Sequence, residues 1–219
     1  MRHVFVETNW LVAYAAPAHH RMPDAGELLS RASAGEIRLY LPSICISEAR
    51  RPLNKEYQPR STADRVRDFL RWAKREQLIN SSEEENSRRV LDKMESRIKA
   101  DLSALDDVFA SLKGKAGLEV FDLDQDMLVR CTELSYLDLG LCPFDQAILA
   151  AVLVRAEQIT KAGANDIAFC ELDSDLQPWG KAGPQKEALT ALYDNAGVWV
   201  YGDFLLANPE MPADWPDGV

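Results

Sequence analysis

The chain has few cysteines and no long hydrophobic run. Its four cysteines stand far apart, without a Cys-x-x-Cys pair, at Cys45, Cys131, Cys142 and Cys170. This spacing argues against a zinc site or a disulfide framework, so we expect free and buried thiols. The longest apolar stretch, residues 148–154, is much shorter than the roughly 20 residues of a membrane-spanning helix. We therefore expect no membrane contact, no signal peptide and a cytoplasmic protein.

Basic side chains are scarce outside one segment. The 219 residues include 25 Lys and Arg against 35 Asp and Glu, which gives a net charge of −10. Residues 50–115 hold 16 of the basic and 12 of the acidic side chains, so this segment is mildly basic and the remainder is strongly acidic. An acidic body repels polyanions, and a mildly basic insert is the part that could attract them.

Short apolar runs alternate with helical patterns outside residues 50–115. Strands are indicated at residues 3–6, 37–41, 118–122, 167–170 and 198–201. Helical patterns separate them at residues 25–34, 126–139, 143–154 and 185–194. Strands that alternate with helices predict an α/β fold, in which helices flank both faces of a parallel sheet.

The segment 50–115 predicts two paired helices. Capping boxes are indicated at Ser61-x-x-Asp64 and at Ser82-x-x-Glu85. The second helix carries an apolar stripe at steps of three and four residues: Leu91, Met94, Ile98, Leu102, Leu105, Phe109 and Leu112. An unbroken stripe of this length predicts one helix of about 45 Å, longer than a compact body needs. We expect one domain from residues 1–49 and 116–219, with 50–115 as an inserted helical hairpin.

Acidic residues follow the predicted strands. They are Glu7, Glu48, Asp145, Glu171, Asp173 and Asp175. Because ligands of an open parallel sheet bind at the carboxyl ends of its strands, we expect these side chains to lie near one another. Carboxylates gathered without cations repel each other. Mg²⁺ or Mn²⁺ is the natural counter-charge, and phosphodiester hydrolysis is chemistry that uses such an ion.

Four motifs in the chain match one known pattern in order. They are Phe5-Val-Glu-Thr-Asn-Trp-Leu-Val12, Leu41-Pro-Ser-Ile-Cys-Ile-Ser-Glu48, Pro143-Phe-Asp-Gln-Ala-Ile-Leu-Ala-Ala151 and Phe169-Cys-Glu-Leu-Asp-Ser-Asp-Leu176. With these motifs the chain resembles the PIN domain family, the fold of many metal-dependent ribonucleases, including the toxins of type II toxin–antitoxin pairs. The resemblance covers residues 1–48 and 118–204 and leaves the insert outside it.

The resemblance implies a PIN-like parallel sheet and an endoribonuclease that depends on Mg²⁺ or Mn²⁺. It implies RNA as the substrate, and an antitoxin or a second copy of the chain as a protein partner. Carried over residue by residue, it makes Glu7, Glu48, Asp145 and Asp173 the catalytic acids that hold the metal. Asp175 is then an auxiliary metal ligand.

Two positions depart from the family pattern. Glu7 stands where the family usually has Asp, so its carboxylate is one methylene farther from the backbone. Glu171 stands where a small hydroxyl residue is usual, and it either adds a ligand or points away. Taken singly, Glu48 is typical of a solvated helix and Asp145 of a helix N-terminus, where the helix dipole favours an acid.

Contacts with RNA are expected on the insert, because the body is too acidic to attract a polyanion. The residues expected to bind RNA are Arg88, Arg89, Lys93, Arg97 and Lys99. Taken alone, such a face is also typical of a solvated helix.

Two other functions stay open. A catalytically silent PIN-like module that binds RNA or protein is favoured if Glu7 and Glu171 spoil the geometry for a metal. A phosphate-accepting receiver-like domain would need paired acids after the first strand and a lysine after a later one. Neither Glu7-Thr8 nor Cys170-Glu171 provides them.

Overall fold

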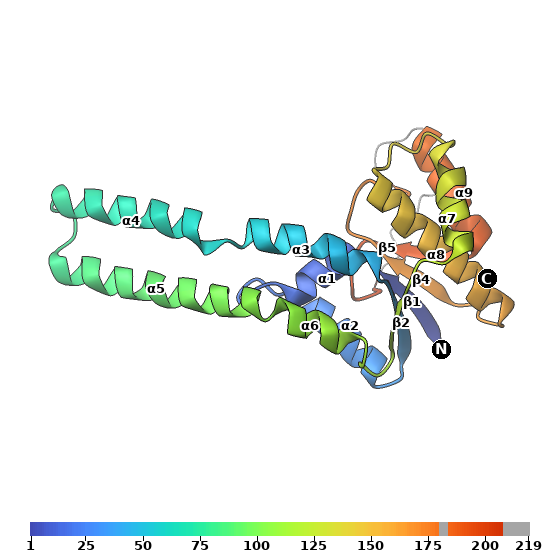
Figure 1. Ribbon diagram of the computed structural model, residues 1–219, viewed down its shortest axis with the longest axis horizontal. Helices are drawn as coiled ribbons and strands as arrows, with labels where there is room; N and C mark the ends of the chain where they lie inside the picture. Colours follow the sequence, from blue (N-terminus) through green and yellow to red (C-terminus); the bar gives the residue numbers. More distant parts are fainter. Residues whose placement is uncertain (180–183, 208–219) are drawn as a thin grey trace.

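A five-stranded sheet forms the centre of the protein. The computed structural model describes residues 1–179 and 184–207. The strands are β1 (Arg2–Val6), β2 (Ile37–Pro42), β3 (Leu118–Phe121), β4 (Ile167–Cys170) and β5 (Val198–Tyr201). They lie in the order β3-β2-β1-β4-β5, and all neighbours are parallel. The predicted α/β class, with a parallel sheet and an inserted helical hairpin, is confirmed (Figure 1).

Helices lie on both sides of the sheet, as its connections require. The chain moves outward from β1 through β2 to β3, then returns to the other side of β1 for β4 and β5. Because crossovers between parallel strands are right-handed, the two halves place their helices on opposite faces. One group is α1 (Thr8–Ala15), α2 (Pro23–Ser33) and α6 (Leu105–Leu112), and the other is α7 (Gln125–Ser135), α8 (Pro143–Lys161) and α9 (Pro184–Ala196) (Figure 1).

The helix α8 is buried along most of its length. From Ile148 to Leu153 every side chain is at most 1% exposed, because α8 packs against β2, α7, α9 and α3. The apolar stretch at residues 148–154 is therefore core. Within the described part of the chain, no helix is long and apolar enough to cross a membrane.

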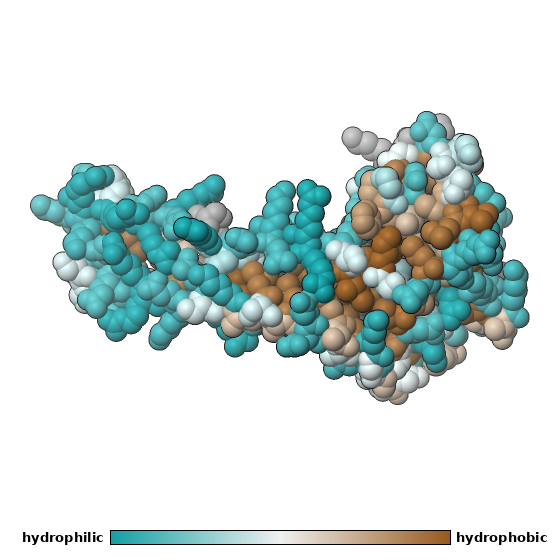
Figure 2. All heavy atoms as spheres, in the orientation of Figure 1, coloured by the Kyte–Doolittle hydropathy of each residue, from teal (hydrophilic) through white to brown (hydrophobic). Residues whose placement is uncertain are grey.

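Helices α4 (Pro59–Arg75) and α5 (Ser81–Ser103) pair and project from the body as an arm, residues 59–103 (Figure 1). Their apolar seam is thin: Ala63, Leu70, Ala73, Leu91 and Ile98 are buried, but none of them belongs to the main core cluster. On the face drawn in Figure 2 the arm is mostly hydrophilic, whereas hydrophobic residues gather over the body. Ion pairs supply much of the contact between the two helices.

Arg67 and Glu84 are the centres of these ion pairs. Arg67 on α4 reaches Glu95 on α5 at 2.9 Å and Asp92 on the same helix at 2.8 Å. Glu84, only 7% exposed, lies 2.6 Å from Lys74 of α4. These contacts give the arm a fixed register without a large core.

The arm differs from the sequence expectation in two ways. The capping box of α5 is Asn80 with Glu83, so Ser82 lies inside the helix, and α4 begins at Pro59. The expected single long helix is also divided, because Ala104 ends α5 and begins α6. Asn80 is an equally good cap and comes first along the chain.

The part of the insert that projects is shorter than residues 50–115. Leu105, Phe109 and Leu112 of α6 belong to the main core, as does Leu53 of α3 (Ile44–Glu56). Both ends of the expected insert are therefore packed into the body. The apolar stripe therefore packs against two partners. Its first positions face α4, and Leu105, Phe109 and Leu112 pack into the body.

The four cysteines are free, but they are not all buried. Cys45 and Cys170 are buried, Cys131 is half-buried and Cys142 is exposed. The expectation of four buried thiols was therefore wrong for Cys131 and Cys142. Cys142 is the N-cap residue of α8, a position that faces the solvent at the edge of the sheet.

Candidate functional site

Two glutamates leave the sheet side by side at the carboxyl ends of its central strands. Val6 of β1 and Cys170 of β4 are partners in the strand register, and Glu7 and Glu171 are the next residue on each strand. The two residues therefore follow adjacent strands at the same level, and the charge of Glu7 acts on Glu171. The chain reverses its winding between β1 and β4, and in open α/β sheets ligands bind at such a switch point.

Both carboxyl groups are buried. Glu7 is 3% exposed and Glu171 is fully buried. Burial raises the pKa of Glu7 to about 8, with further contributions from the charges of Glu48, Asp173 and Asp145. Burial also holds the pKa of Glu171 well above its usual range, and the charge of Glu7 adds to this. Each carboxylate is costly in its charged form unless a cation or a proton accompanies it.

Glu48 reaches the same edge from α3. The hydroxyl of Thr8, the first residue of α1, donates a hydrogen bond to Glu48 Oε2. Thr8 is 7% exposed and follows Glu7 directly, so α1 and α3 are connected next to the buried pair. Glu48 itself is half-buried and can reach solvent.

Asp145 and Asp173 complete the group from two further elements. Asp145 lies in the first turn of α8, and burial raises its pKa, with a further contribution from the charge of Asp173. Asp173 follows β4 by three residues and is half-buried. Asp175 is exposed, and its charge also acts on Asp145. The structure thus brings Glu7, Glu48, Asp145 and Asp173 together, with Asp175 at the rim.

Backbone N–H groups orient three of these carboxylates. Asn9 donates its N–H to Glu7 Oε1 at 2.7 Å, and Asp173 donates to Glu171 Oε1 at 2.5 Å. Asp175 donates in the same way to Asp173 Oδ1 at 2.9 Å. In each case the donor lies two residues beyond the acid, so a tight turn after the strand fixes the side chain.

The second oxygen of Glu171 has no hydrogen-bond partner. Glu171 Oε2 is one of two buried side-chain atoms of the described residues without a partner, and the other is Arg155 Nε. A buried acceptor without a donor costs about 1–3 kcal/mol, and more if it is charged. Lys186 of α9 lies near Asp173 and Asp175 instead, and its ammonium donates to the backbone oxygens of Ser174 and Asp175.

The donor set fits a hard divalent cation. Every candidate ligand is a carboxylate oxygen, as Mg²⁺ and Mn²⁺ prefer, and Glu171 Oε2 is buried without a partner. In the described residues, no three His, Cys, Asp or Glu side chains stand in a geometry that already holds an ion. Holding one would require the half-exposed acids Asp145, Asp173 and Glu48 to turn toward the buried pair.

The expected RNA-binding residues lie elsewhere, on α5 in the arm. Three of them form ion pairs within the helix: Arg88 with Glu84, Arg89 with Glu85, and Arg97 with Asp101. The other two, Lys93 and Lys99, are exposed and form no ion pair with another described residue. This face is therefore less available to phosphates than its sequence indicated.

The sequence pattern leaves the direction of Glu171 open; in the structure its carboxyl group is buried and is affected by the charge of Glu7. The signal that could have placed it was the strand pairing, because two equally long apolar runs that pair in parallel end at the same level. Comparisons of the chain with protein-family models, curated proteins and solved structures find no match.

Proposed function

We propose that this protein is a divalent-metal-dependent endoribonuclease of the PIN type, with Mg²⁺ or Mn²⁺ as its cofactor. The observation that carries this proposal is the buried pair Glu7 and Glu171 at the switch point of the sheet, with Glu171 Oε2 unpartnered. Three further acids act electrostatically on Glu7. An arrangement this unfavourable for the isolated protein is expected where the acids serve a positively charged ligand.

Each carboxylate has a distinct place in this proposal. Glu7 and Glu171 form the floor of the site, where burial excludes water and strengthens their attraction to an ion. Asp145, Asp173 and Glu48 form its rim, from which they complete the ligand set and face the substrate. Thr8 orients Glu48 through its hydroxyl. A divalent cation held by these carboxylates would offset negative charge on the phosphoryl oxygens and would supply an activated water for attack on phosphorus.

The choice of RNA rests on the resemblance to the PIN family. The strongly acidic body repels a polyanion at the site, which accords with a metal ion that offsets this charge where the strand is cut. The expected cytoplasmic location, and an antitoxin or a second copy of the chain as a partner, stay predictions.

Cleavage of a labelled RNA pool tests the proposal. The wild type should cut RNA with Mn²⁺ or Mg²⁺ and lose this activity with a chelator. Asp145→Asn and Asp173→Asn should reduce cleavage by at least about a hundredfold, whereas Glu187→Gln, which removes an exposed acid of α9, should not. Cleavage that persists in chelator, or that both Asn variants retain, would overturn the proposal.

A catalytically silent module that binds RNA or protein is the second candidate. The absence of a ready three-ligand geometry among the described residues favours it. Such a module would bind an ion or RNA without cutting it. Metal-dependent RNA binding by the wild type, without cleavage under any divalent ion, would therefore select the silent module.

A further inference from the structure

The basic surplus of the insert lies in its first half. Residues 50–80 hold nine basic and four acidic side chains, whereas residues 81–115 hold seven basic and eight acidic ones. The first range covers most of α3 and all of α4, and the second covers α5 and α6. The helix expected to bind RNA therefore belongs to the half that carries no positive surplus.

The pairing of the side chains increases this difference. Five exposed cations of α3 and α4 form no ion pair or hydrogen bond with another described residue: Arg51, Lys55, Arg60, Arg65 and Arg75. On α5, Lys93 and Lys99 are also unpaired, but all three arginines are engaged by acids four residues away. Unpaired cations are free to bind phosphates, whereas paired ones must first give up a partner.

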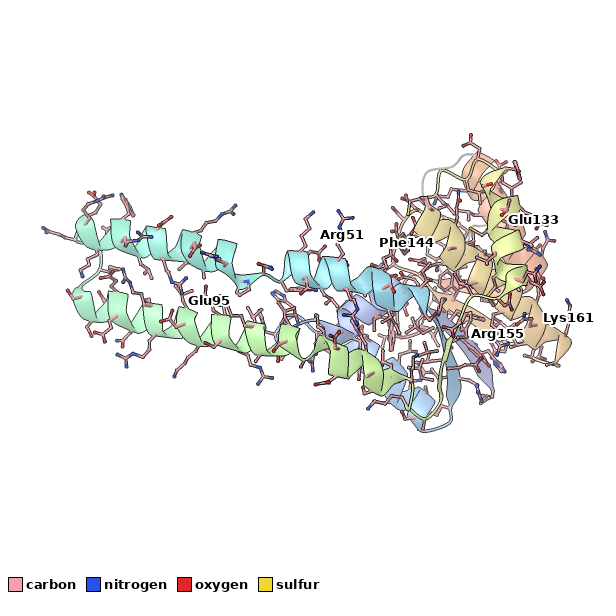
Figure 3. All side chains as sticks on the ribbon, viewed as in Figure 1. Arg51, Glu95, Glu133, Phe144, Arg155 and Lys161 are labelled. Carbon is pink, nitrogen blue, oxygen red and sulfur yellow. The ribbon has the colours of Figure 1, made fainter. Side chains whose placement is uncertain are left out.

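The first of these cations share a helical face with a site residue. Glu48, Arg51 and Lys55 are spaced by three and four residues on α3, which places them on one side of the helix. At about 1.5 Å per residue, Arg51 and Lys55 lie about 5 and 10 Å along the axis from Glu48. Figure 3 shows Arg51 on the outer side of α3, pointing away from α5. The cations therefore continue outward from the acidic site toward the arm.

Exposed aromatic rings lie farther along the insert, on α4. Phe69 and Trp72 of α4 are 58% and 42% exposed, and their ring centroids are 5.6 Å apart. Arg65 precedes them by four and seven residues, on the same face of α4. Exposed rings next to unpaired arginines are the components with which proteins bind single-stranded nucleic acid, because bases stack on the rings and phosphates meet the cations.

We infer that a single RNA strand leaves the acidic site over Arg51 and Lys55 and continues along α4 to Phe69 and Trp72. This inference rests on the proposed function, because it takes the acidic site as the place where the strand is cut. It assigns the phosphate contacts to α3 and α4 instead of α5. It also explains how an acidic body can hold a polyanion, since the strand approaches over the only half of the insert with a positive surplus.

Binding measured in chelator tests this path separately from cleavage. The probe is a fluorescently labelled oligouridine, titrated at several salt concentrations. Arg51→Glu with Lys55→Glu should weaken binding and reduce the salt slope by about 1.4, which is about 0.7 for each lost contact on a single strand. The matched control is Arg89→Glu with Arg97→Glu, which changes the charge equally at exposed, ion-paired positions of α5 and should leave the slope unchanged.

Two further variants keep the test decisive. If the glutamates near Glu48 prevent folding, Arg51→Gln with Lys55→Gln should reduce the slope by the same amount. Phe69→Ala with Trp72→Ala should weaken binding of oligouridine about five- to tenfold and of an RNA duplex of equal length much less. If the double variants on α3 and on α5 lose oligouridine binding equally, the effect is one of net charge alone, and the inference is overturned.

Other outcomes separate the inference from the proposed function. An unchanged salt slope in the α3 variants, with cleavage intact in the wild type, overturns the path alone. A wild type that binds oligouridine through α3 and α4 but never cuts it overturns the nuclease proposal. If the wild type elutes as a dimer and Phe69→Ala with Trp72→Ala as a monomer, the aromatic face belongs to a second copy of the chain, and the inference fails.

Discussion

Thr8 donates a hydrogen bond to Glu48 across the contact between α1 and α3, and this is the one hydrogen bond that the Glu48 carboxylate forms within the described residues. Glu48 is also the only acid of the group that comes from α3. Its position at the site therefore depends on a hydroxyl that follows Glu7 directly in the chain.

Replacement of Thr8 should weaken metal binding more than it weakens the fold. Thr8→Val keeps the shape but removes the hydroxyl, so Glu48 loses its orientation. Loss of such a supporting partner typically costs about 10- to 100-fold in metal affinity. Titration of Mn²⁺ by thermal shift should show this loss for Thr8→Val and not for Thr8→Ser. Equal affinity of both variants would mean that Glu48 is not a ligand.

The metal-free protein should lose stability between about pH 4.5 and pH 8. The pKa of Glu7 is about 8 in the folded protein, against 4.5 for a free carboxyl group. The folded state therefore binds this proton more tightly than the unfolded state. The stabilisation is complete below pH 4.5 and is lost as the pH rises, by up to about 1.4 kcal/mol per pH unit.

Denaturation in chelator, at a series of pH values, measures this effect as a difference between the wild type and Glu7→Gln. The difference matters because burial lowers the pKa of His3, which contributes with the opposite sign near pH 6.5 in both proteins. The wild-type curve should fall relative to that of the variant over this range. Two parallel curves would show that Glu7 titrates normally.

Glu171→Gln should stabilise the metal-free protein and weaken its response to metal. The change removes a buried charge beside Glu7 and supplies an amide that can donate a hydrogen bond to it. Mass action predicts that Mn²⁺ at a hundredfold excess over its dissociation constant stabilises the wild type by about 2.7 kcal/mol. Thermal melts with and without Mn²⁺ should show a smaller gain for Glu171→Gln. Glu187→Gln is the control. If Glu171→Gln keeps the full stabilisation by Mn²⁺, Glu171 is not a metal ligand.

Gly117→Ala should strongly destabilise the body, because this residue has a positive φ of 76° just before β3. A Cβ atom there would lie 2.0 Å from the backbone oxygen of Ala32 on α2. We expect a loss of about 3 kcal/mol or more in the free energy of unfolding. Gly114→Ala is a matched control, since its nearest neighbour would be 3.9 Å away. Urea denaturation of the two variants should separate them, and similar losses would contradict the steric argument.

Most of the fold could be predicted because its strands are short, apolar and separated by clear helices. The run from Val4 to Val6 is central in the sheet and fully buried, so its apolar pattern is a strong signal. The break between α5 and α6 at Ala104 has no signal in the sequence, because the apolar stripe continues through it with the same spacing. The break follows from packing in the body, since Leu105 and Phe109 belong to the main core and Leu91 does not.

The site could be predicted in part. The acids at strand ends were visible because parallel strands end at one edge, and Asp145 was visible because it opens a helix. The burial of Glu171 and the position of Thr8 beside Glu48 depend on tertiary packing, which no local pattern reports. The pairing of Arg88 and Arg89 with acids four residues earlier was visible in principle, since such pairs face each other on a helix.

The central position of β1 has a consequence for the synthesis of the protein. β1 leaves the ribosome long before its second neighbour, β4, which begins at Ile167. At about 5–20 residues per second, roughly 10–30 s separate the two. During that time one edge of β1 lacks its partner and Glu7 has no Glu171 beside it. A nascent chain therefore carries an open apolar edge that other chains can pair with, and its acidic site assembles only after residue 171 has emerged.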